Sequence, residues 1–480
     1  MTDDGRNLLV IGAPEGDAYA YHLSGFLAPD DVICLRVAGK TYLAVSSLEY
    51  GRAEKNAPVD ELLSYEELEI PKLSRELKSS AKGYAAAISN LLESLGASGS
   101  PLVVPAGFPL ADADELRARG LTLTPDRKLF DGLRRAKTSE EVAHVEEAQR
   151  AVEEACEHAV GILRETEVDG NDTLLWRGET LTSEILRSEI NVELLRRNCL
   201  GDGTIAAGGS QAADPHERGS GPLKAGEAII LDIFPKDLSS RYYADMTRTF
   251  IKGDPSEELQ KMYDAVLESQ EAALAMIGPG VNGRDVHRKV ADVLHEAGYK
   301  TNVHDQEPGK PLTEGFFHGT GHGVGLEIHE APRLGLTDQE LVPRHSLRRT
   351  RSLLPGSRRR PHRRPRSRHR RRLPQPDPLP EGVCRLGSRL LALGFGSEVE
   401  TDICPREAFR AGLGTGGGPE PLAPLGEGPK VRERSSGRSP CAVRTSVCGL
   451  QRRAQGRGDG EDRGGASGDR VLRLSGSARA

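Results

Sequence analysis

Three features of secreted or membrane proteins are missing from this sequence. No apolar run approaches the length of a membrane-spanning helix. The opening residues, MTDDGRNLLVIGAP, have no basic segment ahead of their apolar stretch, which argues against a signal peptide. The seven cysteines show no CxxC pair and no paired spacing, so a disulfide framework is not expected. We therefore predict a cytoplasmic protein with reduced thiols and no membrane partner.

Aromatic residues are scarce and unevenly distributed. They make up 4% of the chain, and residues 343–380 contain none of them and no lysine. The net charge of −6 gives no general case for nucleic-acid binding. Acids outnumber bases up to about Glu340, whereas Arg, Pro, Gly and Ser dominate beyond it. The later composition buries too little apolar surface to offset the entropy of ordering, so we expect residues 343–480 to be disordered.

Residues 1–130 alternate strand-like and helix-like runs. The strand-like runs are LLVIGA, DVICLRVA, TYLAVSS and PLVVPA, and AKGYAAAISNLLESLG is helix-like. This alternation predicts a separate α/β domain. None of its strands is followed by a glycine motif of the kind that binds phosphate.

Two helices are predicted from their start signals. Thr138, followed by Glu141, forms a capping box at the head of a long amphipathic helix. Its apolar residues recur at intervals of three and four and should pack on a sheet; they are Val142, Val145, Ala148, Val152, Ala155, Ala159 and Ile162. A second helix is expected to begin with Asp254 as N-cap, Pro255 at its first position and Glu257 at its third.

Two aspartates interrupt apolar strands. Ala228–Phe234 and Tyr242–Phe250 read as adjacent antiparallel strands, with Asp232 in the first and Asp245 in the second. A buried carboxylate is unfavourable unless it is paired or binds a metal. One such residue is more often a structural cap or an ion-pair partner. Two that face each other across paired strands favour a metal site.

Three histidines lie among the glycines of HGTGHGVGLEIHEAP. They are His318, His322 and His329, and the flanking FFHG and GLEIHE look strand-like. Glycines around His322 allow close backbone approach and a turn at this position. A lone histidine is more often a satisfied core or surface residue. Three of them, with two strand aspartates, favour a site of mixed imidazole and carboxylate ligands, suited to Mn, Co, Fe or Zn.

These motifs resemble those of the pita-bread metallopeptidases, the family of methionine aminopeptidase, aminopeptidase P and Xaa-Pro dipeptidase (prolidase). LDIFPKDLSSRYYADMTRTF is similar to the family's two-aspartate hairpin, and FFHGTGHGVGLEIHE to its histidine segment. An α/β domain ahead of a capped helix is similar to the creatinase/prolidase arrangement. The resemblance covers roughly residues 1–340 and implies an α+β fold, with an incomplete pita-bread catalytic domain at 138–342.

The resemblance also implies a dinuclear metal centre. In it Asp232 would chelate one divalent ion, Asp245 would bridge both and His322 would bind the second. Two cations lower the pKa of a water held between them, so that it acts as a nucleophile near neutral pH. The ions implied are Mn, Co, Zn or Fe.

The substrate side of the site is implied in the same way. ADPHERGSGPLKAGE is similar to the family segment that supplies one histidine, here His216. With His318 and His329 it would contact substrate and shuttle protons. The implied substrate is a peptide with proline at the second position, cleaved by dipeptidase or aminopeptidase activity. A homodimer is implied as well.

Two family segments are missing from the sequence. The family takes two further glutamate ligands from segments like VEPGLY and GVRIED, and this chain contains neither. At the place in the chain where these two segments would be expected, the sequence has the arginine-rich run 347–372. The usual interpretation of such a run is a nucleic-acid arm. An alternative is that the reading frame has shifted.

The genetic code favours the shifted frame. After about Pro343, reading one nucleotide later converts suitable codons of Arg349 and Thr350 into Glu-Pro, and VEPGLYF can follow. The residues from Ser357 onward can yield GGVRIED, whose glutamate spans Arg363 and Arg364. The second base of each codon is largely fixed by the observed residue, so an ordered recovery by chance is improbable. We predict a single-nucleotide frameshift and a chain that is inactive because two glutamates are lost.

Three alternatives compete with this interpretation. An arginine-rich nucleic-acid arm is disfavoured, because residues 343–380 lack lysine and interleaved aromatics. A creatinase-like amidinohydrolase shares the architecture but works without metal, and the intact Asp232 and Asp245 argue against it. A catalytically dead homologue that serves in binding describes what this chain would be without its two glutamates.

Overall fold

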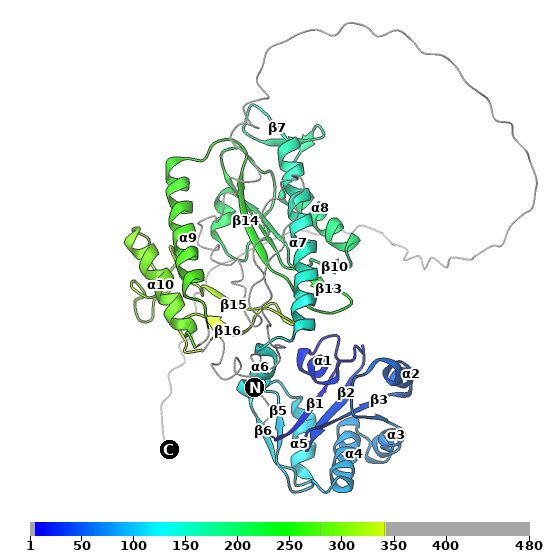
Figure 1. Ribbon diagram of the computed structural model, residues 1–480. Coiled ribbons are helices and arrows are strands. Elements are labelled where there is room, and N and C mark those ends of the chain that lie inside the picture. The colour runs from blue at the N-terminus through cyan, green and yellow to red at the C-terminus, as the bar shows by residue number, and fades with distance from the viewer. Residues whose placement is uncertain (1–4, 279, 340, 342–480) are drawn as a thin grey trace, which may run out of the picture. The chain divides into compact units, whose positions relative to one another are not determined.

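The computed structural model describes residues 5–278, 280–339 and 341 (Figure 1). The predicted α+β class is confirmed: an α/β domain comes first, and a second domain with one long helix follows. The segment 343–480, predicted to be out of frame and disordered, lies outside the described residues. The predicted domain boundaries stay predictions.

The first domain is built on a six-stranded sheet of order β4-β3-β2-β1-β5-β6. β1, β2 and β3 pair antiparallel, whereas β4, β5 and β6 join in parallel. The strands are β1 Asn7–Gly12, β2 Val32–Val37, β3 Lys40–Val45, β4 Glu61–Ser64, β5 Leu102–Val104 and β6 Leu123–Pro125. The four runs predicted as strands correspond to β1, β2, β3 and β5.

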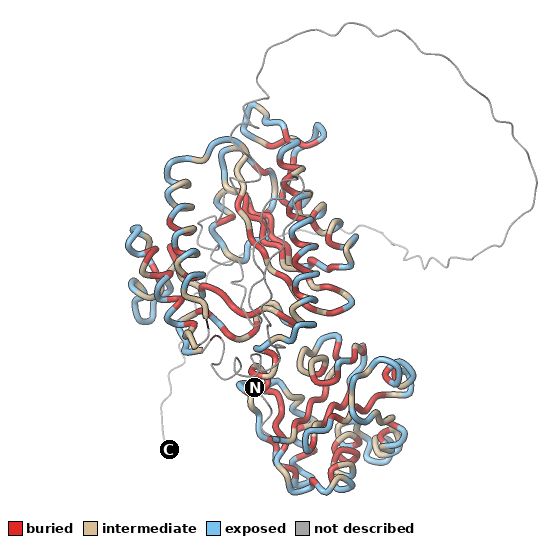
Figure 2. Tube along the Cα trace, in the orientation of Figure 1, coloured by how far each residue is buried: buried red, intermediate tan, exposed pale blue. Residues whose placement is uncertain are grey.

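Helices cover both faces of this sheet. Side chains alternate along a strand, so in β1 Leu8 and Val10 join one core while Leu9 and Ile11 join the other. The helices are α1 Ala18–Ser24, α2 Ser47–Asn56, α3 Ile70–Leu77, α4 Ser80–Ser94, α5 Leu110–Ala118 and α6 Arg127–Arg135. The core of Leu9 contains residues of α3, α4 and α5, and the core of Leu8 contains residues of α1, α2 and α6. Burial on both faces explains the continuous apolar runs of the strands (Figure 2).

The long helix α7, Ser139–Glu165, begins at the predicted capping box. The Thr138 hydroxyl accepts from the backbone N–H of Glu141 (3.2 Å), and the Glu141 carboxylate accepts from the N–H of Thr138 (2.7 Å). From Ala148 onward the predicted apolar stripe is buried in one core with α8 (Ser183–Arg196) and the main sheet of this domain. Val145 is buried in a smaller cluster with Tyr242 and Leu326, and Val142 is half-buried. This helix therefore forms one wall of the second domain.

The strands of the second domain carry or adjoin Asp232, Asp245 and His322. The main sheet has the order β11-β12-β14, with both pairs antiparallel. Its neighbours in the chain are η1 Gly209–Ala213 and α8 Ser183–Arg196. The strands are β7 Glu167–Val168, β8 Leu174–Trp176, β9 Glu179–Thr180, β10 Cys199–Leu200, β11 Ile205–Gly208, β12 Ala228–Ile233, β13 Lys236–Asp237, β14 Met246–Ile251, β15 Gly321–Gly323 and β16 Glu330–Leu334.

The second predicted helix exists, but its predicted start was wrong. Helix α9 spans Glu257–Met276, and its N-cap is Ser256, whose hydroxyl accepts from the N–H of Leu259 (3.2 Å). Asp254 and Pro255 therefore precede the helix. Serine and aspartate are comparable caps, so local sequence did not separate the two alternatives.

Helix α10, Gly283–Glu296, fixes the position of the β15–β16 hairpin. A Cβ added at Gly283 would lie 2.3 Å from the carbonyl oxygen of Arg333, so glycine permits the close approach of helix and strand. The N–H of Gly283 donates to the Gln339 carbonyl (2.7 Å). The strand that follows the histidine segment is thus held against helix α10.

None of the helices in the described part of the chain is long and apolar enough to span a bilayer. The cysteines of that part, Cys34, Cys156 and Cys199, are buried, and no disulfide joins them. Burial raises the pKa of the Cys34 thiol to about 12, so this thiol stays protonated and packs as a small apolar group.

Candidate metal centre

Asp232 lies near the end of the central strand β12 and is 5% exposed. In the antiparallel register it stands opposite Thr247 on β14 and Ile205 on β11. Its carboxylate accepts a hydrogen bond from the Thr247 hydroxyl at 2.6 Å. The expectation that Asp232 and Asp245 face each other across paired strands was therefore wrong, because the cross-strand partner is Thr247.

Asp245 immediately precedes β14 instead of lying within it. The predicted strand Tyr242–Phe250 is shorter than expected at its start, since the chain is strand only from Met246. Its preceding residues are held by other segments: the N–H of Tyr243 donates to the Gly325 carbonyl (2.7 Å), and the Tyr242 hydroxyl donates to Glu141 (2.7 Å). These contacts bring the 2% exposed Asp245 side chain toward the histidine segment.

Glu141 ties this segment to helix α7 and to α1. Burial alone would raise its pKa, but hydrogen bonds from His22, the N–H of Thr138 and Tyr242 outweigh that effect and lower the pKa to about 2. The carboxylate is therefore ionised at neutral pH. It anchors the residues that lead into Asp245.

His322 lies on the short strand β15 and is 5% exposed. Its Nδ1 lies 3.0 Å from the Gly323 carbonyl oxygen, which is an acceptor only, so Nδ1 is the donor. In the neutral ring Nε2 then carries the lone pair, and it lies 3.5 Å from the Asp245 carboxylate. The predicted turn at His322 is a strand, and the GLEIHE run predicted as strand-like is irregular until Glu330.

The remaining candidate histidines occupy different surroundings. The His329 ring stands edge-on to that of His322, with centroids 4.4 Å apart. The His318 ring packs edge-on against Phe316 at 5.2 Å, and its Nδ1 lies 2.7 Å from the Gly319 carbonyl. His216 is exposed in the loop after η1, where its N–H donates to Asp214 (3.1 Å). The structure thus groups Asp245, His322 and His329 side by side.

The described residues do not complete a metal site. An Asp–His pair 3.5 Å apart supplies an oxygen and a nitrogen of the kind that transition metals bind. Across residues 5–278, 280–339 and 341, however, no group of three or more His, Cys, Asp or Glu is placed to hold a metal ion. Protein sites for such ions generally use at least three side chains.

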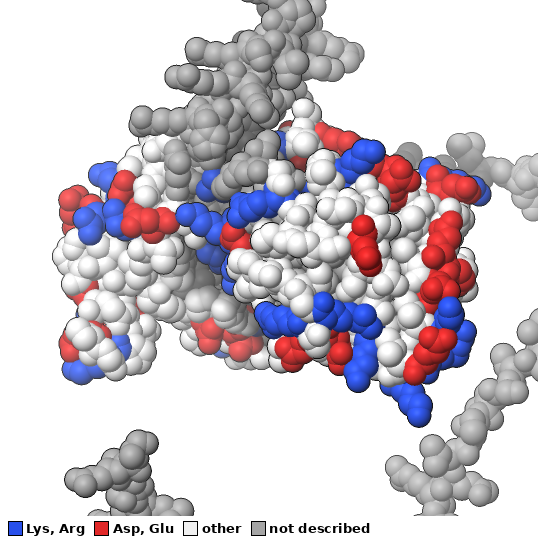
Figure 3. Space-filling model, turned by 90° about the horizontal axis from the view of Figure 1, so that it is seen from below, with Lys and Arg blue, Asp and Glu red and all other residues white. Residues whose placement is uncertain are grey.

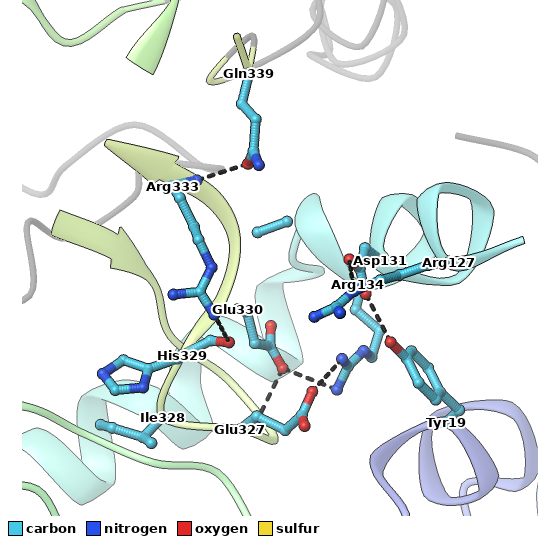
Figure 4. A pocket seen from close by; sticks show the side chains of 11 residues that line it. Tyr19, Arg127, Asp131, Arg134, Glu327, Ile328, His329, Glu330, Arg333 and Gln339 are labelled. Carbon is cyan, nitrogen blue, oxygen red and sulfur yellow. Dashed lines mark hydrogen bonds and ion pairs between the residues drawn. The ribbon is translucent and has the colours of Figure 1, made fainter. Parts of the chain in front are cut away.

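A pocket of about 480 Å³ opens beside His329 (Figure 4). That volume is in the range of small-molecule sites. Residues of α1, α6 and the histidine segment line it, among them Tyr19, Asp131, Arg134, His329, Glu330 and Arg333. The Tyr19 hydroxyl donates to Asp131 (2.6 Å), and burial together with this bond raises the pKa of Tyr19. Tyr19 is thus a neutral group on the wall formed by the first domain.

Sequence reasoning missed a buried histidine that supports the site. His287 on α10 is 1% exposed, and its ring contacts the Thr320 hydroxyl at 2.9 Å and the Asn302 side-chain oxygen at 3.0 Å. The Asn302 amide in turn donates to the His318 carbonyl (3.3 Å). Burial lowers the pKa of His287, although the contact with Asn302 raises it in part. In the sequence His287 carries no signal beyond its place on the apolar face of a helix.

We expect the free energy of unfolding to fall as the pH drops below about 6.5, the ordinary pKa of histidine. Because the folded-state pKa of His287 is lower, the unfolded chain binds its proton at a higher pH than the folded chain. The contribution of His287 is complete above that pH and is lost as the pH falls toward the folded-state value. Urea unfolding from about pH 7.5 to about pH 5 would measure it. His287→Gln should show a shallower decline, and equal slopes would contradict the prediction.

The fold consists of an α/β domain followed by the long helix α7 and a second, sheet-containing domain. The second domain holds a buried carboxylate–imidazole pair, Asp245 and His322. Residues 143–356 match the sequence model of metallopeptidase family M24. This match covers less than half of the chain and supports the resemblance of that segment to the pita-bread metallopeptidases that its motifs indicate.

Individual relatives agree with this match. The chain is 32% identical over 140 residues to the Xaa-Pro dipeptidase of Pyrococcus furiosus, a match that covers 29% of this chain and 36% of that protein. It is 28% identical over 211 residues to an uncharacterized peptidase of Staphylococcus aureus, covering 44% of this chain and 52% of that protein. The matches therefore span about half or less of these curated relatives.

The fold is similar to that of solved structures. The Xaa-Pro dipeptidase from Bacillus anthracis aligns with a TM-score of 0.55 and 21% identity, covering 70% of this chain and 82% of that chain. At this identity the similarity establishes the fold only. It includes the first domain as well as the second, because the second alone is too short for that coverage.

Proposed function

We propose that this chain derives from a dinuclear-metal peptidase that hydrolyses Xaa-Pro bonds and that it is inactive in its present form. The observation that supports the proposal is the buried Asp245–His322 pair, in which a carboxylate oxygen of Asp245 lies 3.5 Å from His322 Nε2. The matched Pyrococcus protein is named as an Xaa-Pro dipeptidase, which supports the substrate class. Proline at the second position of the peptide follows from that class.

The six predicted site residues keep their proposed roles. Asp232, Asp245 and His322 would hold the two divalent ions, of Mn, Co, Zn or Fe, once the missing glutamates are supplied. Substrate-contacting and proton-shuttling roles are proposed for His216, His318 and His329. Of these, His329 is supported best, because it lines the pocket and touches the His322 ring.

The loss of activity follows from the reading frame. The two glutamate ligands that the family implies would be encoded across Arg349 and Thr350 and across Arg363 and Arg364, out of frame in this chain. These positions lie outside the described residues.

Partners and location are part of the same proposal. We propose a homodimer in the cytoplasm that binds peptide substrates and neither membrane nor nucleic acid. On the face shown in Figure 3, the described Lys and Arg side chains are interspersed with Asp and Glu, which gives no continuous basic surface on that face. Interspersed charge favours solubility over binding to a polyanion.

A metal titration tests the proposed loss of metal binding. We expect the 480-residue chain to show no saturable binding of Co²⁺ or Mn²⁺ at about micromolar concentrations, because the proposed site of Asp232, Asp245 and His322 would lack its two glutamate ligands. Isothermal titration calorimetry measures this directly. His322→Gln is the matched control and should behave as the parent chain does. Stoichiometric binding of two ions that His322→Gln abolishes would contradict the proposal.

A further inference from the structure

Glu330 is a buried carboxylate next to His329 that no proposed catalytic role uses. It is 4% exposed, and its side chain forms ion pairs with Lys137 (2.6 Å) and Arg134 (3.2 Å). A carboxylate removed from water is stable only when it is paired in this way. Figure 4 shows the carboxylates of Glu327 and Glu330 turned toward Arg134. Glu330 therefore binds the histidine segment to residues far away in the sequence.

The two cations belong to the connection between the domains. Arg134 is in the last turn of α6, and Lys137 lies between α6 and α7. The Lys137 ammonium also donates to the Arg134 carbonyl (2.6 Å), which fixes the connection itself. The Arg134 guanidinium lies over the Tyr19 ring, 4.3 Å from its centroid, and bonds to Glu327. The connection is thus held by the first domain on one side and by Glu330 on the other.

Gly325 brings a third segment into contact with these charges. A Cβ at this position would lie 2.6 Å from a carboxylate oxygen of Glu330 and 2.7 Å from the Lys137 side chain. The Gly325 carbonyl accepts the N–H of Tyr243, two residues before Asp245. Gly325 is also three residues after His322. The ion pairs therefore pack against Gly325, whose hydrogen bond with Tyr243 links the segment of His322 to the segment of Asp245.

We propose that Arg134 and Lys137 are positioning residues that hold Asp245 and His322 together by way of Glu330 and Gly325. In this proposal the connection between the domains sets the distance between the segment of Asp245 and the segment of His322. The inference rests on the proposed function only in treating Asp245 and His322 as a site. The contacts that carry it are described without reference to metal or activity.

Hydrogen exchange of the Tyr243 amide reports directly on this arrangement, since that amide bonds to Gly325. We expect Lys137→Met to speed its exchange by roughly tenfold to a hundredfold, the factor that corresponds to one charged hydrogen bond. Lys137→Arg should restore most of the protection, because it keeps the charge. Glu330→Gln should speed the exchange of the Tyr243 amide about as much as Lys137→Met does. The double variant should exchange little faster than either single variant, because both changes remove the same ion pair.

Two controls separate positioning from general destabilisation. Glu327→Gln removes the half-exposed carboxylate that shares Arg134 and should leave Tyr243 nearly unchanged. The Ile230 amide on β12, which belongs to the main sheet, should keep its protection in all variants that fold. If Glu330→Gln fails to fold, Lys137→Met and Lys137→Arg still decide the question. Unchanged Tyr243 exchange, or equal acceleration at Ile230, would overturn the proposal.

A frame-restored chain adds an independent readout. There Lys137→Met should lower kcat at constant KM, because misplacing the pair affects the chemical step more than substrate binding. If the restored chain cleaves no Xaa-Pro peptide, the proposed function fails while the exchange result still decides the positioning role. The two failures are therefore distinguishable.

Discussion

Deleting one nucleotide near codon 343 is expected to turn this chain, which we propose to be inactive, into an Mn- or Co-dependent Xaa-Pro dipeptidase or aminopeptidase. In the proposed frame the deletion would restore both glutamates in order, and a complete dinuclear site would supply several kcal/mol of transition-state stabilisation. The rate should rise by at least about a thousandfold over the parent chain. Hydrolysis of an Xaa-Pro dipeptide and of a longer Xaa-Pro peptide, followed by release of the free amino acid, measures the change.

Controls for the restored chain come from the described site. Asp245→Asn in the restored frame should return the rate to background, because its carboxylate would bridge both ions. Resequencing the gene across codons 338–350 distinguishes a shifted frame from a genuine arginine-rich extension. Metal-dependent cleavage by the 480-residue chain itself would show that the prediction of inactivity is wrong.

Phe316→Ala is expected to lower the free energy of unfolding by about 3–5 kcal/mol. Phe316 is fully buried in the core formed by α9, α10 and β16, and its removal leaves a cavity there. Its ring also contacts those of His287 and His318, so the mutation loosens the support of the histidine segment. Guanidinium unfolding, followed by circular dichroism, measures the loss.

The neighbouring residue provides a matched control. Phe317 is only half-buried and contacts His318 at a longer distance of 6.1 Å. Phe317→Ala should therefore cost clearly less than Phe316→Ala. A similar loss of unfolding free energy in both variants would contradict the prediction, because the burial of Phe316 in the core would then not explain its effect.

Much of the architecture follows from local sequence patterns. The buried stripe of α7 and the Thr138 capping box are fixed by spacing alone, since a helix brings residues three and four apart onto one face. Four strands of the first domain, β1, β2, β3 and β5, likewise follow from their apolar runs, whereas β4 and β6 were not predicted. Where two local signals were equivalent, as at Asp254 and Ser256, the sequence did not decide which residue caps α9.

The candidate site was predictable in its residue types and only partly in its geometry. Asp232, Asp245 and His322 stand out in the sequence as polar residues in apolar or glycine-rich surroundings. That Asp245 pairs with His322, while Asp232 lies opposite Thr247, depends on strand register and on where β14 begins. Register results from the packing of whole strands, which no single motif encodes.

The sequence by itself indicated the family resemblance, the six candidate residues and the proposed loss of two glutamate segments, because each of these is read from contiguous motifs. Only the tertiary structure decided how the site is held together. Arg134 and Lys137 are separated from Glu330 by almost the whole second domain in the chain, yet they form its buried ion pairs. Such contacts arise when folding places distant segments side by side and removes their charges from water.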